Sequence, residues 1–322
     1  MIGVQEITPI FIGSPHFVKD LLNDGRFSDE EKNFFTGLGI ETIHTNQNLE
    51  SYDLAKLAFD KMVMDTGIDV QKINLIIYIR SRVPKYFVSS DAARLQFETR
   101  STNALAYSLS DLGCADISMA LKMAHDFLRA NTSSENVVIA YGCKSSTKSR
   151  FRYPVTINGD AGMAILVSRT KKNGFVDFNF KINGRYWDLF HIDFRNKLYE
   201  DYEETCTDQR KYYFELALES RDHFKRLQEE LFARNSLSVG DINHYILQNI
   251  SFRAYEYYET AFDISISPVC KQNLEKFGHL GSGDVMLNLL AGTEGKKFHT
   301  GEKILILNNS PAAAWSCILI EV

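Results

Sequence analysis

One stretch of the chain decides the fold, Asn103-Ala-Leu-Ala-Tyr-Ser-Leu-Ser-Asp-Leu-Gly-Cys-Ala-Asp-Ile-Ser-Met-Ala-Leu121. Its first part is apolar and favours a strand, and a polar turn with Gly113 leads into a pattern typical of a long helix. Cys114 lies at this junction, where unpaired backbone N–H groups and the helix dipole favour a thiolate. A cysteine at a helix start is also a common structural residue. We predict that Cys114 is a nucleophile.

Short β-branched runs alternate with amphipathic helical patterns on both sides of this stretch. In the first half, strands are expected at 73–79, 104–109, 136–141 and 164–167, and helices at 54–66, 92–97 and 115–130. In the second half, strands are expected at 245–247, 303–307 and 316–322, and helices at 212–234, 251–261 and 284–290. Near-continuous apolar strands between helices predict an α/β protein whose central sheet is covered on both faces.

The returning order of elements indicates an internal duplication. We predict an N-terminal half at 1–168 and a C-terminal half at 209–322. The irregular segment 169–208, rich in Phe, Tyr and Asn, is expected to form a cap or hairpin insertion. Gly281-Ser-Gly-Asp-Val285 is a weak echo of Gly113-Cys-Ala-Asp-Ile117. By itself, that echo does not establish a repeat.

Composition limits the function. The 322 residues are 44% hydrophobic and 24% charged, which predicts a large folded protein. Five scattered cysteines indicate neither a disulfide framework nor a metal site, so reduced thiols, no metal and a cytoplasmic location are expected. Without a signal peptide or a run of about 18 apolar residues, no membrane association is expected. A net charge of −5 argues against binding nucleic acid.

One local cluster of positive charge stands out against this acidic background. It places four cations within nine residues, Lys144, Lys148, Arg150 and Arg152. Two interpretations are open at this point. The cluster could contact an acidic carrier protein or a phosphate, or it could be an ordinary solvated loop.

Four motifs occur in a fixed order along the chain: Thr36-Gly-Leu-Gly-Ile-Glu41, Cys114-Ala115 followed by Ala120-Leu121, Asn158-Gly-Asp-Ala-Gly-Met-Ala-Ile-Leu166, and Ala314-Trp-Ser316. In their order and spacing they resemble the ketoacyl-acyl-carrier-protein synthase III family. The resemblance implies the thiolase fold, with two β-α-β-α-β halves stacked in five alternating layers (αβαβα). It also implies a homodimer, formed by strand pairing across a two-fold axis.

The chain departs from this family at two site positions. Gln248, in Leu247-Gln-Asn-Ile-Ser-Phe-Arg253, stands where the family has a catalytic His. His279, after Gly278, stands where the family has an Asn, and Asp284 follows five residues later. Relatives that acylate rather than condense have a similar His and Asp. The resemblance therefore implies a Cys114, His279 and Asp284 relay, with Gln248 holding the substrate.

Two alternatives stay open for these residues. Asp284 would serve equally as an N-terminal helix residue that the helix dipole stabilises. Gln248 would also suit a buried amide in an inactive paralogue.

The resemblance also implies an oxyanion hole built from backbone N–H groups. The expected donors are Cys114 and Ala312, because Ala312 matches a donating Gly of the family while Pro311 has no N–H. Family members that use coenzyme A commonly place an aromatic residue and an Arg where this chain has Asn33 and Thr42. The expected substrate is therefore the phosphopantetheine thioester of an acyl carrier protein, or less favourably of CoA, with no permanently bound cofactor.

These expectations favour an acyltransferase of specialised-metabolite biosynthesis that passes an acyl group from Cys114 to a small-molecule acceptor. Two alternatives remain. One is a decarboxylating condensing enzyme that uses Gln248 and His279 as enolate donors, and the other is an inactive subunit that binds a carrier protein. The acyl pocket is expected to involve Tyr86-Phe-Val88 and the segment 175–194.

Overall fold

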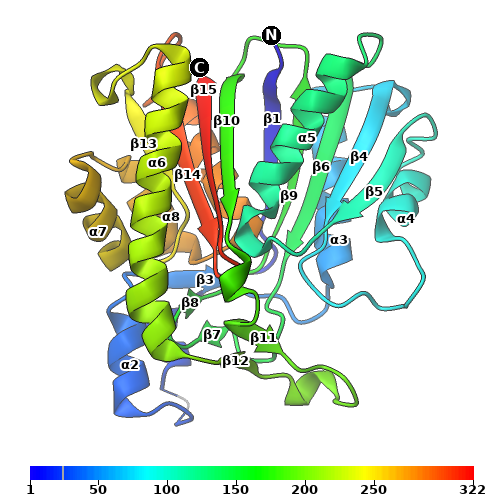
Figure 1. Cartoon of the computed structure of the whole chain (residues 1–322). Coiled ribbons are helices and arrows are strands. Elements are labelled where there is room, and N and C mark those ends of the chain that lie inside the picture. The colour runs from blue at the N-terminus through cyan, green and yellow to red at the C-terminus, as the bar shows by residue number, and fades with distance from the viewer. Residues whose placement is uncertain (24) are drawn as a thin grey trace.

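The computed structural model describes residues 1–23 and 25–322. Within these residues a mixed sheet of nine strands runs through the molecule in the order β13-β14-β15-β10-β1-β9-β6-β4-β5 (Figure 1). Its strands are β1 (Gly3–Ile10), β4 (Ile73–Ile79), β5 (Leu105–Leu109), β6 (Asn136–Cys143), β9 (Ala161–Ser168), β10 (Gly174–Ile182), β13 (His244–Leu247), β14 (Lys303–Ser310) and β15 (Ala314–Glu321).

Helices flank the sheet and short strand pairs lie below it (Figure 1). The helices are α1 (Val18–Leu21), α2 (Asp29–Thr36), α3 (Ser51–Thr66), α4 (Asp91–Glu98), α5 (Asp116–Ala130), α6 (Ala217–Asn235), α7 (Phe252–Phe262), α8 (Pro268–Phe277) and α9 (Asp284–Glu294). The short pairs are β2 (Pro15–Phe17) with β3 (Thr42–His44), β7 (Phe151–Arg152) with β8 (Thr156–Ile157), and β11 (Phe190–Ile192) with β12 (Glu204–Cys206). No helix of the described residues is long and apolar enough to cross a membrane.

The two halves of the sheet repeat one topology. In the first half β4 pairs parallel with β6, and the pairs β6–β9 and β9–β1 are antiparallel. The second half shows the same pattern in β13–β14, β14–β15 and β15–β10. Within the sheet, the ladder between β1 and β10 joins the two halves through one residue pair, Gly3 with Gly174. The topology therefore confirms the predicted duplication.

Side chains that point to opposite faces of the sheet establish its layers. Val138 and Ala140 of β6 belong to the core against α3, whereas Val137 and Ile139 belong to the core that contains α5. On β15, the Trp315 indole donates to Ser220 of α6 and the neighbouring Ser316 hydroxyl donates to Ser118 of α5. Neighbouring residues of a strand face opposite sides.

The order is therefore α3, the first half-sheet, α5, the second half-sheet and α6. Helix α9 joins α5 in the middle layer because it packs against both β1 and β13. This arrangement confirms the five αβαβα layers of the predicted fold.

The prediction that residues 169–208 form an irregular cap or hairpin is wrong for the first part of that segment. Residues 174–182 form β10 in the middle of the sheet, with Phe175 and Phe178 buried. Apolar and polar residues alternate along much of this strand, which is the period of a half-buried strand rather than of a cap. The part of this segment that leaves the sheet begins after Ile182 and carries the β11–β12 hairpin.

Candidate active site

A tight turn places Cys114 at the start of α5. Gly113 has φ 57°, in the left-handed region that glycine adopts without strain, and a single 3-10 turn spans Gly113–Ala115. Asp116, the first residue of α5, then accepts the N–H of Leu112 at 3.1 Å. The thiol therefore lies at the N-terminus of a 15-residue helix, as the sequence predicts.

The same turn recurs at the start of α9. Gly281 also has φ 57°, and Asp284 accepts the N–H of Leu280 at 2.6 Å. The counterpart of Cys114 in this turn is Ser282, whose hydroxyl donates to the carbonyl of Gly113 at 3.2 Å. The weak sequence echo is thus a structural repeat. The two turns meet, so that two helix N-termini converge beside the thiol.

His279 and Asp284 complete a chain of contacts with the thiol. The Cys114 Sγ lies 3.1 Å from Nε2 of His279, and Nδ1 of His279 lies 2.6 Å from Oδ2 of Asp284. The exposed fractions of the three residues are 8%, 1% and 0%. Backbone bonds from His279 to Ile157 and from Gly159 to His279 fix the histidine main chain. The structure therefore brings the three predicted relay residues together.

The electrostatics favour a charged His279. Burial by itself lowers the pKa of this imidazole, but the Asp284 carboxylate and Cys114 together raise the pKa to about 10. His279 therefore carries a proton at neutral pH and faces the sulfur of Cys114. By contrast, burial raises the pKa of the nearby Cys143 thiol, which donates to the carbonyl of Gly159. Cys143 remains a neutral thiol beside the relay.

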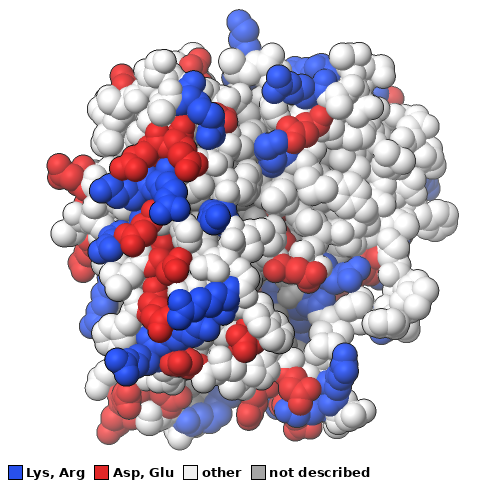
Figure 2. Space-filling model, in the orientation of Figure 1, with Lys and Arg blue, Asp and Glu red and all other residues white. Residues whose placement is uncertain are grey.

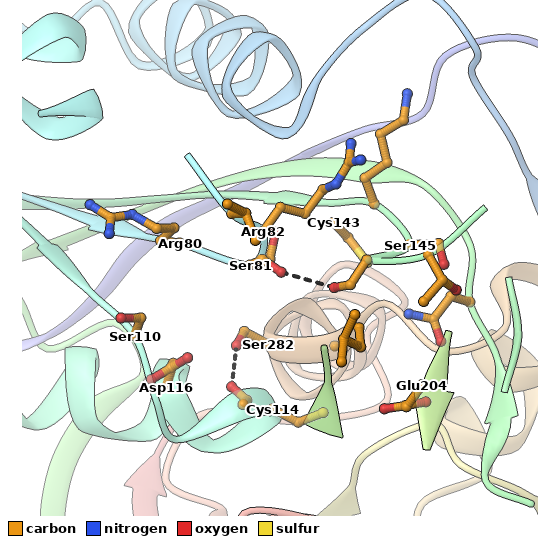
Figure 3. Close-up of a pocket in the computed structure, with 18 of the residues that line it drawn as sticks. Arg80, Ser81, Arg82, Ser110, Cys114, Asp116, Cys143, Ser145, Glu204 and Ser282 are labelled. Atoms are coloured by element: carbon orange, nitrogen blue, oxygen red, sulfur yellow. Dashed lines mark hydrogen bonds between the residues drawn. The ribbon is translucent and has the colours of Figure 1, made fainter. Parts of the chain in front are cut away.

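The relay opens into a cavity of about 920 Å³ (Figure 3). The segment after β10 roofs this cavity with Phe190, Ile192, Phe194, Tyr199, Tyr202 and Glu204. Two sets of hydrogen bonds attach this segment to the rest of the protein. Glu204 accepts two bonds from Arg152, at 2.5 and 2.7 Å, and the Tyr199 hydroxyl donates to the carbonyl of Thr147. Phe87 lies at the rim, so both segments predicted to shape the acyl pocket contribute to the cavity.

The predicted oxyanion donors both line the cavity. Cys114 lies at the turn before α5, and Ala312 lies in the turn between β14 and β15 together with Pro311. Ala313 in that turn has φ 52°, so the backbone keeps a left-handed residue although no glycine is present. Their N–H groups remain the predicted donors.

The structure does not place Gln248 with the relay. Its Nε2 donates to Oδ1 of Asn309 at 2.7 Å, and the residue does not line the cavity. The loop after β13 turns this side chain toward β14. The structure therefore brings Cys114, His279 and Asp284 together but not Gln248, whose role in holding the substrate stays a prediction.

Most of the four cations in the basic cluster form ion pairs or hydrogen bonds with other groups of the same chain. Arg150 pairs with the buried Asp160 at 3.0 Å, Arg152 pairs with Glu204, and Lys144 donates to the carbonyl of Asn46 at 2.6 Å. Only Lys148 among the four is exposed. Figure 2 shows positive and negative side chains intermixed over the visible face rather than gathered in one basic patch. Three of the four cations are therefore engaged within the protein, which fits neither a surface for an acidic carrier nor a fully solvated loop.

Two site features escaped the sequence analysis. Glu204 gave no signal because its partner Arg152 is more than fifty residues away in the sequence. Asn288 did offer a signal, since it is a polar residue one helical turn after Asp284 and interrupts the apolar run from Val285 to Ala291. No group of three or more His, Cys, Asp or Glu within residues 1–23 and 25–322 is arranged to hold a metal ion.

Known proteins with similar sequences or structures share this architecture. No family model matches the chain. The β-ketoacyl-[acyl-carrier-protein] synthase III of Clostridium perfringens is 22% identical over 297 residues, 88% of each chain. That of Sodalis glossinidius is 21% identical over 265 residues, 82% of each.

Solved structures match over the whole chain. The acyltransferase ChlB3 has a TM-score of 0.84 at 19% identity, covering 100% of this chain and 97% of its own. The 3-oxoacyl-[acyl-carrier-protein] synthase III of Aquifex aeolicus has a TM-score of 0.80 at 16% identity and full coverage of both chains. OleA of Xanthomonas campestris, in a point variant, has a TM-score of 0.78 at 14% identity, covering 100% of this chain and 98% of its own.

The layers, the duplicated halves and these matches define a protein of the thiolase fold. Over most of its length, the chain is similar at low identity to β-ketoacyl-[acyl-carrier-protein] synthase III enzymes. The predicted resemblance is confirmed.

Proposed function

We propose that this protein is an acyltransferase that carries its acyl group as a thioester on Cys114. One observation carries the proposal, the buried line from the Cys114 sulfur through His279 to Asp284 with contacts of 3.1 and 2.6 Å. A thiol paired with an imidazole that a carboxylate orients is the arrangement needed for nucleophilic acyl transfer.

The reaction has two halves. In the first, the Cys114 thiolate attacks the carbonyl carbon of an acyl thioester and the pantetheine thiolate leaves. The leaving pantetheine sulfur takes the proton from Nε2 of His279. In the second, Nε2 of His279 accepts the proton of the acceptor while the acceptor attacks the acyl carbon and the Cys114 thiolate leaves. The N–H groups of Cys114 and Ala312 would stabilise the oxyanion in both halves.

The position of Gln248 favours transfer over decarboxylating condensation. That reaction needs two donors aimed at the enolate oxygen, and Gln248 is instead bonded to Asn309 outside the cavity. His279 is left as the single member of the predicted donor pair at the thiol. The assembled relay also disfavours an inactive carrier-binding subunit, because such a subunit has no need of a buried histidine and carboxylate at the thiol.

The proposed substrates are those that the resemblance in sequence implies. The donor is the phosphopantetheine thioester of an acyl carrier protein, or of CoA, and the acceptor is a small molecule, in cytoplasmic biosynthesis of a specialised metabolite. The cavity volume of about 920 Å³ has room for the pantetheine end and an acyl group together.

Labelled malonyl thioester distinguishes the two reactions. The protein, an acyl carrier thioester and ¹⁴C-carboxyl-malonyl carrier protein are incubated together. Because Gln248 does not face the cavity, we expect acyl-Cys114 to form without release of labelled carbon dioxide above the level of Cys114→Ala. Release of one carbon dioxide per acyl group consumed would establish condensation instead.

A homodimer would cover the exposed edge of the sheet. Strand β5 ends the sheet with Leu105 64% exposed, and Phe87 and Val88, in the segment between β4 and α4, are more than 90% exposed. Val88 also has φ 65°, a conformation that a β-branched residue rarely adopts without contacts to hold it. Pairing of β5 with its copy would satisfy the edge and bury these side chains.

Light scattering after gel filtration tests this interface. The wild-type protein is expected at twice the 36.8 kDa mass of one chain. Leu105→Lys places a charge on the edge strand and is expected to give the monomer at micromolar concentration. Met64→Lys on α3, where the side chain is 82% exposed, is the matched control and should remain dimeric. A monomeric wild type would overturn the dimer.

A further inference from the structure

We infer that Asn288 is a positioning residue for the relay, acting through the loop that follows β13. Asn288 is fully buried on α9, one turn after Asp284, among apolar neighbours. Burial of an amide is unfavourable unless its hydrogen bonds are made. Each of its polar atoms has a partner, which indicates that a polar group is required at this point. The inference rests on the proposed function, since it assigns a role within the same relay.

Asn288 holds the two residues on either side of Gln248. Its Nδ2 donates to the carbonyl of Leu247 at 2.8 Å and to Oδ1 of Asn249 at 2.9 Å, while its Oδ1 accepts from Asn273 at 2.8 Å. With the amide reversed, its oxygen would face two other oxygens, so this network fixes its orientation. The loop is thereby tied to the helix that carries Asp284.

The loop after β13 places a backbone N–H within hydrogen-bonding distance of the Asp284 carboxylate. The N–H of Asn249 donates to Oδ2 of Asp284 at 2.8 Å, the same oxygen that His279 contacts at 2.6 Å. With the N–H of Leu280 on Oδ1, the carboxylate accepts three hydrogen bonds. These donors stabilise the negative charge of the carboxylate, so the shared proton remains on Nδ1 of His279. Nε2 is then the nitrogen that exchanges a proton at the thiol.

The buried network has two further members, whose variants can distinguish a role in positioning the relay from a role in stability alone. Asn273 contacts Asn288 and the carbonyl of Leu287 but not the loop, whereas the Tyr255 hydroxyl donates to Oδ1 of Asn249 at 3.2 Å. Both side chains are buried, so each variant costs stability. Of the two, only Tyr255 contacts Asn249, the residue whose N–H donates to Asp284.

The test is the pH profile of Cys114 alkylation by iodoacetamide, followed by peptide mass spectrometry, which needs no acyl substrate. Asn288→Ala is expected to lower the rate at pH 6.5 about tenfold, the effect of one lost hydrogen bond to a charged group, and to shift the profile to higher pH. Tyr255→Phe, which leaves no cavity, should shift it in the same direction by less. Asn273→Ala should leave the profile in place while lowering the melting temperature.

Equal profiles for all three variants and wild type, in folded protein, would overturn the positioning role. A shift in Asn273→Ala as large as in Asn288→Ala would do the same, because it would reduce the effect to general loosening. If Asn288→Ala does not fold, Tyr255→Phe decides between the two. If no acyl adduct forms on the wild type while the alkylation profiles differ as expected, the proposed function fails and the positioning role stands.

Discussion

Replacement of His279 by Ala is expected to lower the rate of Cys114 alkylation at pH 6.5 about 10- to 100-fold, because the sulfur loses the protonated imidazole beside it. In the wild type, the protonated imidazole lies 3.1 Å from the sulfur and favours its ionised form. The difference should shrink as pH rises, since more of the thiol ionises unaided. The measurement is the alkylation rate of the Cys114 peptide between about pH 5.5 and 9, a range that spans the titration of an ordinary thiol.

A second histidine, at the edge of the core, provides the control. His244 contacts Glu302 at 2.9 Å in a pair of similar geometry, but it lies outside the cavity. His244→Ala should therefore leave the alkylation profile unchanged. A wild-type profile in His279→Ala would show that the 3.1 Å contact does not activate the thiol.

Replacement of Asp284 by Asn is expected to reduce acyl transfer about 10²- to 10⁴-fold, the range for losing a correctly oriented acid–base group. The wild-type carboxylate accepts three N–H groups, from His279, Asn249 and Leu280. An asparagine has one oxygen and one NH₂, so at least one of these donors would face the NH₂ group. Even with the amide oxygen on Nδ1 of His279, the neutral side chain would no longer stabilise the positive charge of the imidazole. Steady-state transfer from an acyl thioester measures the loss.

The duplicated fold supplies a matched variant for Asp284. Asp116 starts α5 as Asp284 starts α9, but its Oδ1 accepts the N–H of Leu112 and it contacts no histidine. Asp116→Asn keeps an oxygen for that N–H and should lose less than about tenfold, because no acid–base group loses its partner. Equal losses in the two variants would reduce Asp284 to a helix-capping residue, the alternative that the sequence left open.

Local pattern was enough to predict an α/β fold with a covered central sheet, and the family resemblance implied its five layers. The strands at β4, β6 and β14 carry long apolar runs, so their burial on both faces was visible in the sequence. Strand β1 was missed because Gln5, Glu6 and Pro9 interrupt its apolar run. Strand β10 was assigned to the cap because its apolar and polar residues alternate within a Phe-rich segment.

The relay was predictable but its surroundings were not. Cys114, His279 and Asp284 stand at motif positions, and the turns before α5 and α9 place them by local backbone geometry. The direction of the Gln248 side chain was not predictable, because it depends on Asn309, which is distant in the sequence. The internal pairing of the basic cluster was not predictable for a similar reason. Their partners, Asp160 and Glu204, are set by tertiary packing rather than by local sequence.

The central claim is that Cys114 carries the acyl group, and intact-protein mass spectrometry after incubation with acyl carrier thioesters tests it most directly. The account predicts that the wild type gains the mass of one acyl group, that Cys114→Ala gains none, and that a small-molecule acceptor removes the adduct from the wild type. An adduct that persists in Cys114→Ala, or a wild type that gains no mass from any acyl thioester while remaining folded, would contradict the claim.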